Sequence, residues 1–160
     1  MNVLGIDPGL DGALALYNGE GLGNILEIPA AKSTGRGREV LWSTLNQQWD
    51  ELFFWADHVF LERVNARPLD GGSSAFKFGS IYGGLRGMIV AKLLPYDLVT
   101  PVVWMKAMGV GLGSKEASCL RAEQLFPGRN FRGPRGGKKD GVAEAALIAK
   151  YGFQKLTGNS

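Results

Sequence analysis

The sequence predicts an α/β protein with one mixed five-stranded sheet flanked by helices. Three short apolar runs come first, followed by helix, strand, helix, strand and further helices. Strands joined by tight turns pair antiparallel and strands joined through helices pair parallel, so this order produces a mixed sheet. The chain has 160 residues, 45% of them hydrophobic, and one cysteine. It can bury a core without disulfides, and we expect a single domain over residues 1–160.

The N-terminal residues predict an antiparallel hairpin and a third strand. Residues 3–6 and 13–17 are apolar runs, with Pro-Gly and Asp-Gly turn dipeptides between them. Residues 25–28 can supply the third strand. The following stretch, residues 30–38, is polar and contains glycine, so we expect a mobile loop there.

A helix, a strand and a second helix follow. Residues 39–56 carry apolar side chains at three- and four-residue steps, which predicts an amphipathic helix. Residues 58–61 form a short apolar run that predicts a buried strand. Ser73 or Ser74 can cap a helix that runs to about residue 93 and is stopped by Pro95.

The last third of the chain predicts one strand and three helices. Residues 97–100 suit a strand, and residues 101–107 suit a helix because a proline occupies its first turn. A serine begins the next helix, over residues 114–126. The final helix covers residues 140–151, with no helix breaker before Gly152.

Three glycines share one face of the helix that starts near residue 73. Gly79, Gly83 and Gly87 stand four residues apart, and each costs a helix about 1 kcal/mol relative to alanine. We therefore expect another surface to approach this face closely. The chain's own sheet, a second subunit and a DNA backbone all remain open as that surface.

Basic residues are concentrated near the C-terminus. The net charge is +3 and the isoelectric point about 9.1. Residues 128–139 contain four glycines, one proline and no acid, which predicts a flexible basic loop suited to a polyanion. Its basic residues are Arg129, Arg132, Arg135, Lys138 and Lys139.

No membrane or secretory segment is expected. The sequence lacks the ~18 uninterrupted apolar residues of a membrane span, and Asp7 comes too early for a secretory apolar region. We therefore expect a cytoplasmic protein.

Four carboxylates lie at the ends of apolar elements. Asp7 ends the first strand and Glu62 ends the strand after the first helix, so adjacent strands would bring them together. Asp140 and Glu144 stand four residues apart at the start of the last helix and therefore share a face. Like charges this close repel one another unless a cation lies between them.

This acidic set suits a pair of hard divalent ions. Mg²⁺ and Mn²⁺ prefer oxygen ligands, and two such ions can activate water and stabilise both oxygens of a phosphodiester displacement. His58 and Cys119 are too few for a zinc site. Each acid also has a structural interpretation: Asp7 as a turn former, Glu62 as a partner of Arg63, and the other two as residues that stabilise a helix start. We interpret Asp11 as a turn residue.

Four segments together resemble RuvC-type Holliday junction resolvases. They are GIDPGLDGALAL at 5–16, FLERV at 60–64, SSAFKFGSIYGGLRG at 73–87 and KKDGVAEAALIA at 138–149. The match is spread along most of the chain. The resemblance implies a ribonuclease H-like fold, a homodimer, and Mg²⁺- or Mn²⁺-dependent paired nicks at a four-way DNA junction that leave a 5′-phosphate.

The resemblance also assigns residues. It implies that Asp7, Glu62 and Glu144 are catalytic metal ligands, whereas the family's usual penultimate position is Gly141 here. Asp140 matches an additional acid of some viral relatives, and we include it among the candidate catalytic ligands. The resemblance further places the helix from residue 73 at a dimer interface. It places two lysines that can contact DNA, Lys106 and Lys115, near the cleft. Aromatic rings near the cleft, such as those of Phe76 or Phe78, can stack on bases.

Three alternative functions remain. A branched-DNA-binding module without catalysis would keep the basic loop and tolerate loss of the acids. A related nuclease of the same fold could act on flaps, other branched DNA or RNA·DNA hybrids. An actin-like ATPase shares a glycine-containing acidic hairpin, but it needs two such lobes, and 160 residues hold only one.

Overall fold

The computed structural model describes residues 1–35, 37–64, 71–111, 115–133, 137 and 139–158. A five-stranded sheet with the order β3-β2-β1-β6-β7 forms its centre. β1 pairs antiparallel with β2 and parallel with β6, while β2–β3 is antiparallel and β6–β7 parallel. The predicted mixed sheet is therefore confirmed. Its strands are β1 (Val3–Asp7), β2 (Ala13–Tyr17), β3 (Leu22–Glu27), β6 (His58–Glu62) and β7 (Tyr96–Val99).

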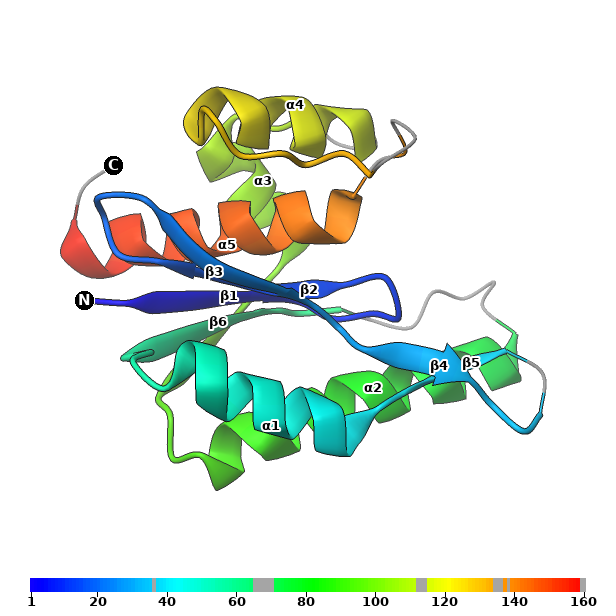
Figure 1. Cartoon of the computed structure of the whole chain (residues 1–160). Coiled ribbons are helices and arrows are strands. Elements are labelled where there is room, and N and C mark those ends of the chain that lie inside the picture. Colours follow the sequence, from blue (N-terminus) through cyan, green and yellow to red (C-terminus); the bar gives the residue numbers. More distant parts are fainter. Residues whose placement is uncertain (36, 65–70, 112–114, 134–136, 138, 159–160) are drawn as a thin grey trace.

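Helices cover both faces of this sheet (Figure 1). α1 and α2 lie on one face, and α3, α4 and α5 lie on the other. The strands supply alternate side chains to two separate apolar clusters, one under each helical layer, as expected for strands buried on both faces. The helices are α1 (Trp42–Phe53), α2 (Gly72–Ala91), α3 (Pro101–Met108), α4 (Lys115–Leu125) and α5 (Asp140–Thr157).

The expected mobile loop at residues 30–38 is instead a small β-hairpin. β4 (Ala30–Lys32) pairs antiparallel with β5 (Arg38–Val40). Backbone hydrogen bonds close both ends of the hairpin, from Ser33 N to Gly37 O at 3.1 Å and from Leu41 N to Pro29 O at 2.8 Å. The prediction was wrong because polar composition does not prevent backbone pairing.

Two helix ends also differ from expectation. α2 begins at Gly72 after an N-cap at Gly71, and no side chain caps it, so neither predicted serine has that role. α5 continues past Gly152 to Thr157. A Cβ at Gly152 would overlap the ring of Phe60, so this glycine permits close packing of the helix on β6 and does not end it.

The described residues do not cover the glycine face of α2. Among them, no atom outside the backbone of α2 and the neighbouring residues lies within 4 Å of a Cβ placed at Gly79, Gly83 or Gly87. The interpretation that this face packs tightly on the chain's own sheet was therefore wrong. Gly84 makes the close contact instead, against the indole of Trp42 at the start of α1. Among the helices of the described residues, none has the length and apolarity of a membrane span.

Candidate active site

Asp7 and Glu62 lie side by side at one edge of the sheet. The parallel register pairs Ile6 with Leu61, and one further step places Asp7 opposite Glu62. Ile6 and Leu61 both belong to the cluster under α1 and α2, so the next residue on each strand points to the opposite face. The two carboxylates therefore share the face that α5 covers, as the sequence predicted for adjacent strands.

Glu62 is a buried carboxylate with a specific hydrogen bond. Its side chain is 7% exposed, and Oε1 accepts a bond of 2.8 Å from Nε1 of Trp104 on α3. Burial raises the pKa of Glu62 above its ordinary value of 4.5, and the Trp104 bond partly opposes that rise. The described contact of this carboxylate is with Trp104 and not with Arg63, so the ion-pair interpretation of Glu62 receives no support.

Close backbone packing positions the acids of α5. A Cβ at Gly5 of β1 would overlap the backbone of Ala145 and Ala149, so the helix lies directly on the strand. At its first turn, a Cβ at Gly141 would overlap the carbonyl oxygen of Asp11 in the β1–β2 turn. The helix thus begins beside the end of β1. The same contact leaves no room for a Cβ at position 141 unless the turn shifts.

The two acids of α5 have different surroundings. Glu144 accepts a hydrogen bond of 3.1 Å from the hydroxyl of Ser118 on α4, and Ser118 is fully buried. Asp140 lines a polar pocket together with Asp11 and Glu27. This pocket therefore connects the first turn of α5 with the end of β3.

The donor set fits a hard divalent cation. The candidate ligands are all carboxylates, and burial of Glu62 disfavours its ionised form, a cost that a bound cation would offset. In the described part of the chain, no three His, Cys, Asp or Glu side chains are close enough together to hold one ion. Metal binding by Asp7, Glu62, Asp140 and Glu144 therefore stays a prediction from chemistry and placement.

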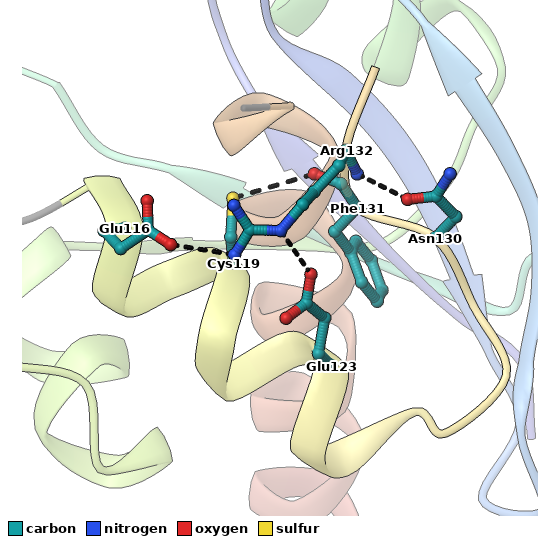
Figure 2. Close-up of polar contacts among 6 residues, drawn as sticks. All are labelled: Glu116, Cys119, Glu123, Asn130, Phe131 and Arg132. Atoms are coloured by element: carbon teal, nitrogen blue, oxygen red, sulfur yellow. Dashed lines mark hydrogen bonds and ion pairs between the residues drawn. The ribbon is translucent and has the colours of Figure 1, made fainter. Parts of the chain in front are cut away.

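The basic loop has a closed stem anchored on α4. Lys139 N donates to Phe131 O at 3.1 Å, and Gly133 N donates to Gly137 O at 2.6 Å. The guanidinium of Arg132 pairs with Glu116 at 2.8 Å and Glu123 at 2.9 Å (Figure 2). These two carboxylates raise the pKa of Arg132 above its ordinary value. Arg132 thus holds the loop to α4 in this structure.

The other residues predicted to contact DNA differ in their partners and in their positions in the fold. Arg129 donates to the carbonyl oxygens of Leu22 and Gly23 on β3, and Lys139 pairs with Glu27. Lys106 is exposed in the last turn of α3, and Lys115 is the first residue of α4. Their DNA contacts stay predictions. Two further candidates, Arg135 and Lys138, lie outside the described residues.

The remaining chemically reactive side chains have structural partners. His58 Nε2 is 3.1 Å from Oδ2 of Asp97 on the neighbouring strand. Cys119 is buried on α4, its thiol 3.8 Å from Phe131 O, and burial raises the pKa of that thiol. Neither residue adds a nucleophile or a ligand to the acidic edge, the end of the sheet that carries Asp7 and Glu62. The aromatic ring of Phe76 is 77% exposed, whereas Phe78 is half-buried.

Three residues with contacts at or near the site were not singled out from the sequence. Trp104 and Ser118 donate to Glu62 and Glu144, and Arg38 pairs with Asp11 beside the first turn of α5. The first two contacts join residues 42 and 26 positions apart, so no local pattern indicates them. The third depended on the β4–β5 hairpin, which was predicted as a loop.

Comparison with known proteins identifies the architecture. No protein-family model matches the chain, and no curated protein sequence matches it. Among solved structures, Thermus thermophilus RuvC in complex with a Holliday junction substrate aligns with a TM-score of 0.66 at 19% identity, covering 99% of this chain and 97% of that one. The fowlpox virus Holliday junction resolvase aligns with a TM-score of 0.54 at 15% identity, covering 98% and 99%. The chain therefore has the ribonuclease H-like fold of RuvC and the poxvirus resolvases over nearly its whole length.

Proposed function

We propose that the protein is a metal-dependent, structure-selective endonuclease that resolves four-way DNA junctions by paired symmetric nicks. The observation that carries this proposal is the placement of Asp7 and Glu62 side by side under the start of α5. Two proteins that share the fold are described in complex with Holliday junction DNA. We further propose a homodimer acting in the cytoplasm of a bacterium or a phage-infected host.

The acidic edge would provide the chemistry. Resolvases of this fold use divalent metal ions. We propose that Asp7, Glu62 and Glu144 would hold two Mg²⁺ or Mn²⁺ ions between them and that Asp140 would support a ligand or water. Bound ions would supply an activated water and neutralise charge that develops on the phosphate. Trp104 and Ser118 hold two of these carboxylates in place through hydrogen bonds.

Basic residues around this edge would supply most of the affinity for DNA. Lysine and arginine contacts to phosphates release counterions, so binding should weaken steeply as salt rises. Phosphate contacts do not distinguish one base from another, so selectivity for a junction would come from the geometry of the dimer and the deformability of the DNA. The proposed contacts are Lys106, Lys115, Arg129, Arg132, Arg135, Lys138 and Lys139.

Cleavage of a labelled synthetic four-way junction tests the function. Duplex, flap and RNA·DNA hybrid substrates are run beside it, with Mg²⁺, Mn²⁺ or EDTA. Asp7→Asn should abolish nicking and keep junction binding. Asp50→Asn, which removes the same charge from the Lys92 pair on α1, is the matched control and should nick normally.

The outcomes separate the alternatives. Paired symmetric nicks that need a metal and Asp7 establish a resolvase. Junction binding without cutting under any metal would instead support a binding module. Equal cutting of flaps or hybrids would keep the chemistry but remove the four-way junction as the dedicated substrate.

A further inference from the structure

We propose that Arg38 and Lys139 form a phosphate-binding subsite for the DNA strand that passes the acidic edge. In the DNA-free protein, Asp11 and Glu27 pair with these two cations, and the incoming phosphates displace the carboxylates. This inference rests on the proposed function, because it names how that site would hold its DNA.

The two cations and their carboxylates line one pocket. The pocket has a volume of about 300 Å³ and is bounded by the β1–β2 turn, the end of β3, β5 and the first turn of α5. Asp140, one of the candidate metal ligands, lines the same pocket. A phosphate held there would therefore lie next to the proposed catalytic edge.

Both ion pairs in this pocket are exposed to solvent. Arg38 Nη1 lies 2.7 Å from Asp11 Oδ1, and these side chains are 45% and 85% exposed. Lys139 pairs with Glu27 in a similar setting, with 34% and 60% exposed. Ion pairs this exposed contribute little to the free energy of folding, so replacing the carboxylate partner with another anion costs little free energy. A phosphate offers the guanidinium a bidentate, charge-assisted partner in place of Asp11.

Arg38 also borders a second pocket, on the side of α2. This pocket, of about 280 Å³, is lined by Arg38, Glu39, Trp42, Phe76 and Lys77 among others. Lys77 Nζ would be 3.1 Å from a Cβ at Gly37, so the lysine lies against the β4–β5 turn. Figure 1 shows this hairpin running beside α2.

Three cations from three separate elements therefore follow one path. Lys139 precedes α5, Arg38 lies on β5 and Lys77 lies on α2, with the exposed ring of Phe76 at the far end. A row of cations with an exposed aromatic ring is typical of surfaces that follow a nucleic acid strand, because phosphates bind the cations and bases stack on rings. A small isolated anion would need only one of these positions. We therefore assign a DNA strand as the ligand.

A double-mutant cycle on Arg38 and Asp11 tests the exchange. Binding to a four-way junction and to a single-stranded oligonucleotide is measured in EDTA across a salt series. Arg38→Ala should weaken binding about tenfold at low salt and lower the salt slope by about one. Asp11→Asn should tighten binding about threefold when Arg38 is present. In the Arg38→Ala background it should have no effect, because no guanidinium remains to be released.

Controls separate this exchange from a general change in net charge. Lys92→Ala and Asp50→Asn alter the ion pair between α1 and α2 by the same charges and should leave the salt slope unchanged. If Arg38→Ala does not fold, Arg38→Gln serves in its place, with thermal unfolding checked for every variant.

The outcomes also separate the subsite from the function. If Asp11→Asn tightens binding equally with and without Arg38, the effect is only electrostatic and the exchange is wrong. If Arg38 variants bind with unchanged affinity and slope, the subsite is wrong even where the wild-type protein nicks junctions. The effects of Arg38→Ala and Asp11→Asn on binding can also be non-additive while the wild-type protein never nicks a junction. That result would support the subsite and contradict the proposed nuclease function.

Discussion

Nε1 of Trp104 donates a hydrogen bond of 2.8 Å to Oε1 of Glu62, and both side chains are buried. This bond connects α3 to the end of β6, so it fixes the direction of one candidate metal ligand. It also lowers the pKa of a carboxyl group whose burial raises it. Trp104 is thus a positioning residue that keeps Glu62 closer to its ionised form.

Removal of this donor should shift the acid side of the pH profile for nicking. Trp104→Phe leaves Glu62 buried without the bond, so the pKa of Glu62 rises further and its ionised form, which a metal needs, is lost at a higher pH. A pH–rate profile at saturating metal measures the shift. Trp55→Phe, at an exposed indole, is the matched control. An unchanged acid limb would show that the bond has no electrostatic role.

Glu62→Gln should stabilise the metal-free protein at neutral pH. The pKa of Glu62 is higher in the folded state than its ordinary 4.5, so the wild-type protein loses stability as pH rises through that raised pKa. Glutamine carries no charge and keeps an oxygen for Trp104. We expect a gain on the order of 1 kcal/mol, or about 2–4 °C in Tm, that disappears below about pH 4. Thermal unfolding in EDTA at several pH values tests this; an equal gain at all pH values contradicts the assignment.

Gly141→Ala should destabilise the fold by about 2–3 kcal/mol, because its Cβ would overlap the backbone of the β1–β2 turn. Urea unfolding measures the loss. Gly72→Ala, at the open start of α2, is the control and should change stability by less than about 0.5 kcal/mol.

Because a Cβ at position 141 overlaps the β1–β2 turn, Gly141→Asp should fail to restore nicking to the Asp140→Asn variant. Restoration would mean that the turn can move aside.

Arg132→Gln should destabilise the stem of the basic loop. The substitution removes the ion pairs with Glu116 and Glu123, so Tm should fall and the loop should become more sensitive to protease. Because Arg132 is also a proposed phosphate contact, the salt slope of junction binding should fall by about one in the same variant. A lower Tm with an unchanged slope would assign the guanidinium to the loop stem alone and remove Arg132 from the DNA contacts.

The central sheet and the position of its acids could be predicted from the sequence because both depend on local patterns. Turn dipeptides separate the first two apolar runs, and Glu62 directly follows the apolar run of residues 58–61. The β4–β5 hairpin could not be predicted in this way. Its strands are three residues long, largely exposed and joined by backbone bonds that leave no apolar alternation.

Side-chain contacts between residues far apart in the chain could not be predicted from the sequence either. Within the basic loop, Arg132 pairs with α4 and Arg129 with β3 carbonyls, and neither partner follows from the composition of the loop. Composition shows how many charges a segment carries but not which acids fold back to meet them. The course of α5 through Gly152 likewise depends on the ring of Phe60, which lies on a distant strand.

The direct backbone contact between β1 and α5 has a consequence for how freely this protein can diverge. Main-chain atoms, and not the shape of interlocking side chains, set the spacing between β1 and α5 at Gly5 and between α5 and the β1–β2 turn at Gly141. Such a contact requires only that a few positions remain without a Cβ. Other core positions can exchange one apolar residue for another while the carboxylates keep their spacing. A chain can therefore differ from Thermus thermophilus RuvC at about four of every five aligned positions and still share its fold.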